Sequence, residues 1–396
     1  MIDIENKIKE LATEYYDETV ALRRHFHQHP ELSFKEFETS AFICKKLEEY
    51  GICYQKGIAK TGILARIEGA KPGKVIALRS DLDALPITEK NDVSYCSINE
   101  GVMHACGHDA HMASLLGAAK ILKTLEQEFE GTVLLIFQPG EERYPGGARL
   151  MLEEGIFDDL KPDMIIAQHV FPELETGKAG FKPGIYMASA DEIFFTVKGQ
   201  GGHSALPHKL TDSVLIMAHI ITALQQITSR NAPAGIPTVL SFGKVEANGA
   251  NNIIPDEVKV AGTLRTMNEA WRREAKKRIQ KIACSIAEGM GATCEFKINH
   301  GYPALLNDEK TTSLARSFTR DYLGEENVAD LDIRMTSEDF AYFSLDYPVT
   351  YYRLGVKAPD AKSESSLHTT TFNIDENALI TGMGTMAYLA MRFLKE

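Results

Sequence analysis

The sequence is poor in cysteine and in long apolar runs, and each shortage excludes a class of protein. Six cysteines are too few, and too irregularly spaced, to crosslink a chain of 396 residues, so free thiols in a reducing cytosol are expected. No apolar run reaches the roughly 18 residues that a membrane-spanning helix requires. The cysteines are Cys44, Cys53, Cys96, Cys106, Cys284 and Cys294.

Basic clusters are absent as well. The formal net charge is −12 and the sequence pI is about 5.6, without a basic block or stripe. Nucleic acids and anionic membranes are therefore not expected as partners. Residues 1–20 are charged and amphipathic, and they lack the apolar segment and cleavage site of a secretory signal. These features together predict a cytoplasmic protein.

The composition that remains is that of an ordinary globular protein, 44% hydrophobic and 25% charged. Residues 1–189 alternate strand and helix patterns, with apolar strands expected at Lys74–Arg79, Thr132–Gln138 and Met164–Gln168. Continuous apolar strands between helices are typical of a parallel sheet that is covered on both faces. The fold class expected for this part is therefore α/β, with a mainly parallel sheet.

From Asp191 the pattern changes to that of a smaller α+β domain. Its order of strands and helices is β-α-β-β-α-β, the ferredoxin-like split motif. After residue 302 the first pattern returns, so an α/β domain in two pieces, residues 1–189 and 303–396, is predicted to carry an inserted domain at residues 190–302. The elements expected in the insert are Ile193–Lys198, Asp212–Ser229, Thr238–Val245, Val258–Arg265, Glu269–Glu288 and Thr293–Asn299.

Polar side chains follow the three apolar strands expected in the first domain. Because ligands bind beyond the carboxyl ends of parallel strands, these side chains are expected to meet at one edge of the sheet. They are Asp81 and Asp83 after the first strand, Glu141 and Glu142 after the second, and His169 after the third.

A cysteine and a histidine two positions apart precede an expected helix. The glycine between Cys106 and His108 allows both side chains to point at one metal ion, although a histidine-rich helix start is the alternative. Glu142, His169 and His368, the last in a polar loop, complete a mixed set of five ligands. This set exceeds what one tetrahedral ion takes and fits two ions about 3.5–4 Å apart.

The adjacent Glu141 and Glu142 allow a division of labour. One carboxylate binds metal, and the other takes a proton from bound water and passes it to a leaving amine. The alternative is a pair of acids stabilised by a helix dipole. The pair follows a buried strand and a Pro-Gly turn, which favours the catalytic interpretation.

Nine motifs follow one another in the order found in a known family. They are LRSDLDALP, HACGHDAH, FQPGEE, AQHV, GGHSALPH, NNIIPDEV, GTLRT, SEDF and LHTTTFN. The chain resembles the dinuclear amidohydrolases of the aminoacylase-like metallopeptidase family, above all the branch of N-acyl-L-amino acid amidohydrolases, hippurate hydrolases and auxin-conjugate hydrolases. The resemblance extends from Arg23 to the final helix, and HACGHDAH with FQPGEE is specific to that branch.

The resemblance implies a zinc-exopeptidase-like catalytic domain, in which helices sandwich a mainly parallel mixed sheet. It implies a homodimer formed through the inserted dimerisation or lid domain. It also implies two divalent metal ions per subunit, manganese, zinc, cobalt or nickel, and Glu141 as the general base that works with metal-bound hydroxide. The implied metal ligands are Cys106, His108, Glu142, His169 and His368.

Three residues of the insert are candidates for contact with substrate. The resemblance assigns oxyanion stabilisation to His203, in cis or across a dimer, and the alternative is a loop histidine that caps a turn. Arg265 either clamps a substrate carboxylate or forms a structural ion pair. Asn252 either binds a substrate carboxylate or amide, or supports its loop.

Other polar residues near the cluster are expected to have supporting roles. Asp83 either holds a ligand histidine in its working tautomer or caps the following segment. Asp109 and His111 are expected to pack or to face solvent, and His104 to line the site. Because i, i+2 positions of a helix do not face each other, structural roles are predicted for three alternating histidines, His25, His27 and His29.

The sequence therefore predicts a metal-dependent amidohydrolase that cleaves an N-acyl-L-amino acid, with an acetyl or aromatic acyl group, into a carboxylate and a free amino acid. The alternatives are a dipeptidase or carboxypeptidase of the same family, and a non-catalytic metal- or ligand-binding protein on this fold. Many relatives continue the glutamate pair with glycines, whereas this chain has Arg143 and Tyr144. These residues add bulk and a cation beside the metal ligands, which bears on substrate preference.

Overall fold

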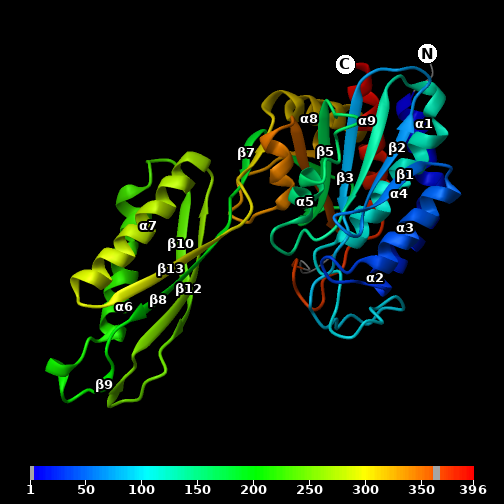
Figure 1. Ribbon diagram of the computed structural model, residues 1–396. Coiled ribbons are helices and arrows are strands. Elements are labelled where there is room, and N and C mark those ends of the chain that lie inside the picture. Colours follow the sequence, from blue (N-terminus) through cyan, green and yellow to red (C-terminus); the bar gives the residue numbers. More distant parts are fainter. Residues whose placement is uncertain (1–3, 360–365) are drawn as a thin grey trace. The chain divides into compact units, whose positions relative to one another are not determined.

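The computed structural model describes residues 4–359 and 366–396, which fold into two compact units (Figure 1). The first unit comprises Met1–Gly184, Leu306–Asp332 and Asp339–Glu396. The second comprises Ile185–Leu305 and Ile333–Glu338. Each unit has a hydrophobic core of its own.

An eight-stranded mixed sheet forms the centre of the first unit. Its strands are β1 (Cys53–Ile58), β2 (Gly62–Glu68), β3 (Val75–Asp81), β4 (Thr132–Gln138), β5 (Met164–Glu175), β6 (Ala179–Phe181), β15 (Val328–Asp330) and β16 (Val349–Lys357). Their order is β1-β2-β4-β3-β5-β16-β6-β15. The central strands β4, β3, β5 and β16 run parallel, whereas β1, β2 and β6 add antiparallel pairs. The predicted mainly parallel mixed sheet is confirmed.

Helices cover both faces of this sheet. They are α1 (Ile4–Glu14), α2 (Tyr16–Gln28), α3 (Phe37–Glu49), α4 (His108–Thr124), α5 (Gly147–Glu153), α8 (Glu309–Leu323) and α9 (Ala378–Lys395), with short 3-10 helices at Glu126–Glu128, Glu325–Asn327 and Asp339–Leu345. On one face, α4 and α9 pack in a core with Ile76 and Leu78, alternate residues of β3. The opposite face of β3 carries Arg79, which bonds to Asp339.

The helix α4 is buried almost throughout because its residues are largely small or apolar. It begins directly after Gly107, whose φ of 88° lies in the left-handed region. A Cβ atom at this position would lie 2.4 Å from Cγ2 of Val170. Glycine therefore allows the amino end of α4 to approach β5 closely, and this approach brings the cysteine–histidine motif to the sheet edge.

The strand β5 is longer than the sequence predicts. The prediction ended the strand at Gln168 and placed His169 beyond it, whereas His169 lies within β5. The strand β3 pairs with β5 only as far as Ala167, but β16 continues the pairing to Glu175. The predicted end of β5 was therefore wrong. It lies close to the point where the pairing with β3 stops, but the pairing with β16 keeps the strand extended beyond that point. His169 still lies just past the end of the β3–β5 ladder.

The second unit has the predicted β-α-β-β-α-β order. Its main elements are β8 (Asp191–Lys198), α6 (Ser213–Leu224), β10 (Thr238–Glu246), β12 (Glu257–Thr266), α7 (Glu269–Gly289) and β13 (Thr293–His300). The strands form an antiparallel sheet of order β10-β12-β8-β13. Alternate residues of β8 are buried and share a core with α6 and α7. The predicted α+β fold of the insert is confirmed.

Smaller elements complete the second unit and the segments in which the chain passes from one unit to the other. In the second unit, β9 (Gly202–His203) pairs with β11 (Ile253–Ile254), and short helical turns occupy Pro207–Lys209 and Ile227–Asn231. Where the chain passes between the units, β7 (Gly184–Met187) pairs with β14 (Leu305–Asn307). The helix predicted at Asp212–Ser229 is shorter than expected, because Asp212 caps its first turn and α6 ends at Leu224.

All six cysteines have free thiols in the structure. Over residues 4–359 and 366–396, the structure contains no helix with the length and apolar character needed to cross a bilayer.

Candidate metal centre

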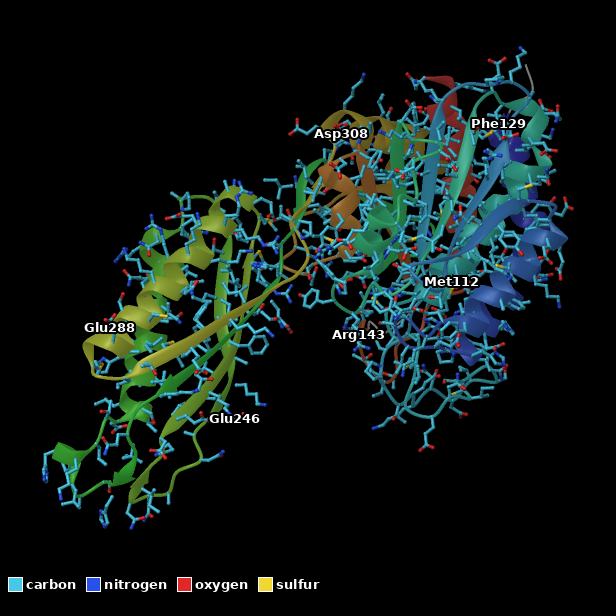
Figure 2. The ribbon with its side chains drawn as sticks, viewed as in Figure 1. Met112, Phe129, Arg143, Glu246, Glu288 and Asp308 are labelled. Atoms are coloured by element: carbon cyan, nitrogen blue, oxygen red, sulfur yellow. The ribbon has the colours of Figure 1, made fainter. Side chains whose placement is uncertain are left out.

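The polar residues predicted to follow the central strands lie at one end of the first unit. Figure 2 labels Phe129 and Arg143 at opposite ends of β4: the strand begins shortly after Phe129 and ends shortly before Arg143. Glu141 and Glu142 therefore lie at the Arg143 end, at the carboxyl edge of the parallel strands.

The donor atoms of the five predicted ligands form two overlapping groups. Cys106, His108 and His169 place one ligand atom each within 4.8 Å of one another. Cys106, Glu142 and His368 do the same. Cys106 Sγ lies 3.4 Å from His169 Nε2, and His368 Nε2 lies 3.2 Å from Glu142 Oε1. The structure thus brings together all five side chains, with Cys106 common to both groups.

Two of the histidines are oriented by backbone carbonyls. His108 Nδ1 lies 2.7 Å from the carbonyl oxygen of Asp83, and His169 Nδ1 lies 2.7 Å from that of Val170. Because a carbonyl only accepts hydrogen bonds, the proton of each neutral ring is on Nδ1. The lone pair of each Nε2 is therefore available to a metal ion, as is usual for ligand histidines.

Unpaired polar atoms provide a test of whether the residues fit a metal. Within the described part of the chain, His108 Nε2 is buried without a hydrogen-bond partner, with Asp81 Oδ2 3.6 Å away. Native proteins rarely bury such atoms unpaired. An imidazole nitrogen, a carboxylate oxygen and the thiol of Cys106 are donors that divalent transition metals accept, so the donor set fits divalent cations.

The electrostatics of the cluster also favour a cation. Burial, with the nearby Glu142 and Glu141 carboxylates, raises the pKa of the Cys106 thiol well above its usual range. Burial lowers the pKa of His108, but Asp81 and Asp83 outweigh this effect and raise it to about 10. Nearby carboxylates contribute to the first shift, after burial, and cause the second. Divalent ions would neutralise this buried negative charge.

His111 lies beside the cluster but has no free ring nitrogen. Its Nδ1 lies 2.6 Å from Asp81 Oδ1, and its Nε2 accepts a hydrogen bond of 2.9 Å from the backbone N–H of Val170. The proton is therefore on Nδ1 and is donated to Asp81. Packing or solvent contact was predicted for His111, and the structure gives it a buried, packed position in which it bonds to the backbone of Val170, next to His169.

Asp109, for which packing or solvent contact was predicted, likewise lies in the interior. It is buried and accepts a hydrogen bond of 2.8 Å from Arg23 Nε, with His27 Nδ1 equally close. His27 is thereby structural, as predicted, and His25 stacks on Phe42 with ring centroids 3.8 Å apart. No local pattern indicated the Arg23–Asp109 pair, because the two residues are far apart in sequence.

His104 is buried next to this network, and neither of its ring nitrogens has a hydrogen-bond partner among the described residues. Burial lowers the pKa of His104 to about 3. The ring is therefore neutral at physiological pH.

Asp83 supports the site through two different groups. Its backbone carbonyl orients His108, whereas its carboxylate accepts hydrogen bonds from the backbone N–H groups of Glu141 and Glu142 at 3.0 and 2.9 Å. The hydroxyl of Ser33 donates to the same carboxylate at 2.6 Å. Of the two alternatives predicted for Asp83, the structure shows the contact that orients His108, whereas the carboxylate holds the distant Glu141–Glu142 turn and not the segment that follows Asp83. No pattern in the sequence indicated that Ser33 contacts Asp83.

A buried arginine lies behind the acidic residues. Arg79 is fully buried and donates to Asp81 at 2.6 Å and to Asp339 at 3.0 Å. It also donates to the Gln138 side chain at 2.9 Å. Removing this cation would leave the negative charge of two buried carboxylates without a neutralising guanidinium.

We expect Arg79→Leu to lower the free energy of unfolding by about 3–5 kcal/mol, because one partner of a buried ion pair is lost. Urea unfolding of the purified variants measures this difference. Arg149→Leu is the matched control: its exposed i, i+4 pair with Glu153 is worth less than about 1 kcal/mol. Equal losses in the two variants would contradict the assignment.

The substrate candidates His203 and Asn252 lie together in the second unit. Because β9 pairs with β11, His203 lies opposite Ile253, and the backbone carbonyl of Asn252 accepts a hydrogen bond of 3.1 Å from Ser204. His203 Nδ1 accepts a hydrogen bond of 3.1 Å from the backbone of Ala205. The proton of the neutral ring is therefore on Nε2, which can donate.

Arg265 lies apart from these two residues. It is near the end of β12, whereas the His203 loop lies near the beginning, where Gly201 donates to Asp256. Arg265 is eight positions along the strand from Glu257, which corresponds to about 26 Å at 3.3 Å per residue. The guanidinium donates to Met335 O and Ser337 Oγ, both at 3.3 Å, so it has no carboxylate partner among these contacts.

Comparisons with known proteins bear on this fold and site. Residues 77–392 match the peptidase family M20/M25/M40. The chain is 42% identical over 301 residues to the N-acyl-L-amino acid amidohydrolase of Geobacillus stearothermophilus, covering 76% of this chain and 81% of that protein. It is 38% identical over 375 residues to the N-acetyl-L-cysteine deacetylase of Bacillus subtilis, covering 95% and 88%.

A solved structure is also similar to this chain along nearly its whole length. The YXEP protein of Bacillus subtilis, described as a dinuclear metal-binding peptidase of the M20 family, matches with a TM-score of 0.82 and 34% identity over 97% of this chain and 99% of that one. The family resemblance predicted from the motifs is confirmed. The chain belongs to the peptidase family M20/M25/M40 and is a metal-dependent hydrolase that acts on amides.

Proposed function

We propose that this protein hydrolyses the amide bond of small N-acyl-L-amino acids, with an acetyl or aromatic acyl group, to a carboxylate and a free amino acid. The observation that carries the proposal is the turn after β4. It presents two adjacent carboxylates, of which Glu142 reaches the Cys106 group and Glu141 lies buried beside it. The names of the Geobacillus and Bacillus relatives support the substrate class.

The proposed cofactors are two divalent metal ions per subunit. The residues that would hold them are Cys106, His108, Glu142, His169 and His368. When bound, such ions polarise the scissile carbonyl and lower the pKa of water toward about 7. Thiolate and imidazole donors favour zinc, cobalt or nickel, and the carboxylates also accept manganese.

Glu141 is the proposed general base and acid. Its side chain is 6% exposed, and its backbone N–H is held by Asp83, so its position is set before substrate binds. Glu141 takes a proton from the attacking water and delivers it to the nitrogen of the leaving amine. The carbon–nitrogen bond breaks, and the water oxygen remains in the product carboxylate.

The second unit is proposed to contribute substrate contacts. His203 would donate from Nε2 to the oxyanion, and Asn252 or Arg265 would bind the substrate carboxylate. Within one chain, Arg265 lies about 26 Å along β12 from the end that holds the His203 loop. Both residues can therefore contact one small substrate only if they come from different subunits of a homodimer.

The surface of the second unit supports a second copy of the chain as partner. The helix α6 exposes Leu215, and its Met217 and Ile221 are only partly buried. The strand β10 is at the edge of the sheet, so one side of its backbone is unpaired. An exposed apolar helix face and an open strand edge are features that a two-fold pair of subunits can bury.

Mixing two impaired variants tests the dimeric site. His203→Ala and Arg265→Ala are each expected to lower kcat/KM at least about 100-fold, because each loses a charge-stabilising contact. After subunit exchange between equal amounts, about 25% of wild-type activity is expected, since half the dimers are hybrids with one complete site. The control is each variant taken through the same exchange procedure without the other. No recovery would show that the two residues do not act across subunits.

A competitive hydrolysis assay tests the substrate class. The mixture contains acetyl-amino acids, hippurate and dipeptides, with metal-loaded protein. It also contains substrates whose acyl group ends in a carboxylate, because the exposed Arg143 follows Glu142 directly. The proposal predicts that N-acyl amino acids are consumed first. Faster consumption of dipeptides would favour the peptidase alternative, which the description of the YXEP relative supports. No consumption with manganese, zinc, cobalt or nickel would favour a non-catalytic binding protein.

A further inference from the structure

A buried carboxylate from the segment between α2 and α3 reaches the turn that carries the proposed base. Glu36 has no exposed surface. Its Oε1 accepts hydrogen bonds from the backbone N–H groups of Gly140 and Phe34, both at 2.9 Å. Its Oε2 accepts a hydrogen bond of 2.7 Å from the hydroxyl of Thr61. Both oxygens are therefore occupied, and Glu36 is placed to support the turn.

Glu36 completes a continuous set of backbone contacts. It holds the N–H of Gly140, and Asp83 holds the N–H groups of the next two residues, Glu141 and Glu142. Three consecutive backbone donors thus end on two buried carboxylates. Such support fixes the backbone from which both functional side chains project.

Phe34, in the same segment as Glu36, packs closely against Gly140 of the turn. Gly140 has a φ of 60°, and a Cβ atom there would lie 2.4 Å from Cζ of Phe34. Phe34 itself has a φ of 62°, which is costly for a residue other than glycine and persists where surrounding contacts enforce it. The close contact therefore couples the position of Gly140 to the Phe34–Glu36 segment.

We propose that Glu36 is a positioning residue, which holds the backbone at Gly140 so that the Glu141 carboxylate stays aimed at the reacting water. This inference rests on the proposed role of Glu141. Glu36 acts through the N–H of Gly140 and not through substrate or metal, because both of its oxygens are taken by the contacts described above.

The chemistry of Glu36 suggests a conservative replacement. Burial and the nearby Asp83 raise the pKa of Glu36 to about 7. The charged and the neutral carboxyl can both accept from Gly140 through Oε1, with any proton on Oε2 facing Thr61. Glutamine preserves this arrangement, because its amide oxygen accepts both N–H groups and its amide nitrogen donates to the Thr61 hydroxyl. Aspartate keeps the charge but is one methylene too short.

Four variants test the proposal. We expect Glu36→Gln, and Thr61→Val as matched control, to keep kcat within about threefold of wild type, because the contact with Gly140 survives. Glu36→Ala and Glu36→Asp should lower kcat about 10–100-fold, with KM and metal content unchanged, since small misplacements of a catalytic group can cost about 100-fold. Wild-type kcat in Glu36→Asp, or loss of metal that accounts for its loss of turnover, would overturn the proposal.

Amide hydrogen–deuterium exchange provides a readout that does not depend on turnover. In metal-loaded protein, the peptide that contains Gly140 is expected to exchange at least about tenfold faster in Glu36→Ala and Glu36→Asp, and at the wild-type rate in Glu36→Gln. Unchanged exchange in both shortened variants would refute the positioning role. If Glu36→Ala does not fold, the aspartate and glutamine variants decide the question. Wild-type turnover in Glu141→Gln would instead refute the base and leave the exchange result standing.

Discussion

Replacing Glu141 by glutamine is expected to lower kcat by roughly 10²–10⁴-fold, the usual contribution of a general acid–base group, while the protein keeps its metal. Glutamine has the same shape, and the backbone N–H at this position stays bonded to Asp83 at 3.0 Å. The substitution therefore removes the proton carrier and little else. Steady-state kinetics with an N-acetyl amino acid, together with elemental analysis of the same samples, measure both quantities.

A nearby glutamate serves as the control for this variant. Glu154 also accepts a backbone hydrogen bond, from Ala59, but belongs to the loop that follows α5. Glu154→Gln should therefore keep kcat close to that of the wild type. Retention of wild-type kcat by metal-loaded Glu141→Gln would contradict the assignment of Glu141 as base.

The second large effect is expected on metal affinity. Replacing His108 and replacing His111, two histidines of α4, should have different consequences for it. His108→Ala removes a ring whose Nε2 is unpaired among the described residues, and we expect metal affinity to fall more than about 100-fold. His111→Asn removes a ring whose nitrogens already bond to Asp81 and Val170. A residue that only supports a ligand costs about 10–100-fold in affinity or activity, so the asparagine variant should still bind metal at saturating concentration.

Equilibrium dialysis followed by elemental analysis measures this contrast directly. The wild-type protein dialysed beside the variants provides the reference stoichiometry. Equal metal affinity in the wild type and in His108→Ala would remove His108 from the ligand set. Complete loss of metal from His111→Asn, with His108→Ala unaffected, would exchange the roles assigned to the two histidines.

The sequence predicted the fold well where local patterns determine it. The apolar run Thr132–Gln138 predicted β4 with its observed limits, whereas β3 was predicted at Lys74–Arg79 and is Val75–Asp81, so that it includes Asp81. In the insert, alternation along Ile193–Lys198 predicted β8. The end of β5 was missed because it depends on pairing with β16, which lies far along the chain. Strand ends set by a distant partner leave no local signal.

In the candidate site, too, local patterns predicted some residues and missed others. The cysteine–histidine motif and the glutamate pair were found because the donors stand close together in sequence. The supports of the site were not found, because Glu36 and Gly140 lie 104 residues apart, and Arg23 and Asp109 lie 86 apart. An isolated glutamate or arginine has no pattern that separates a buried support from a surface charge. Only folding brings these partners together.

The most direct test of the account is a titration of metal-free protein with a divalent ion, in which bound metal and hydrolysis of an N-acetyl amino acid are measured on the same samples. The account predicts that activity rises from zero to its maximum as two ions bind per chain. It also predicts that Glu141→Gln binds the same two ions and stays at least about 100-fold less active. Full hydrolysis by the metal-free protein, or by metal-loaded Glu141→Gln, would contradict it.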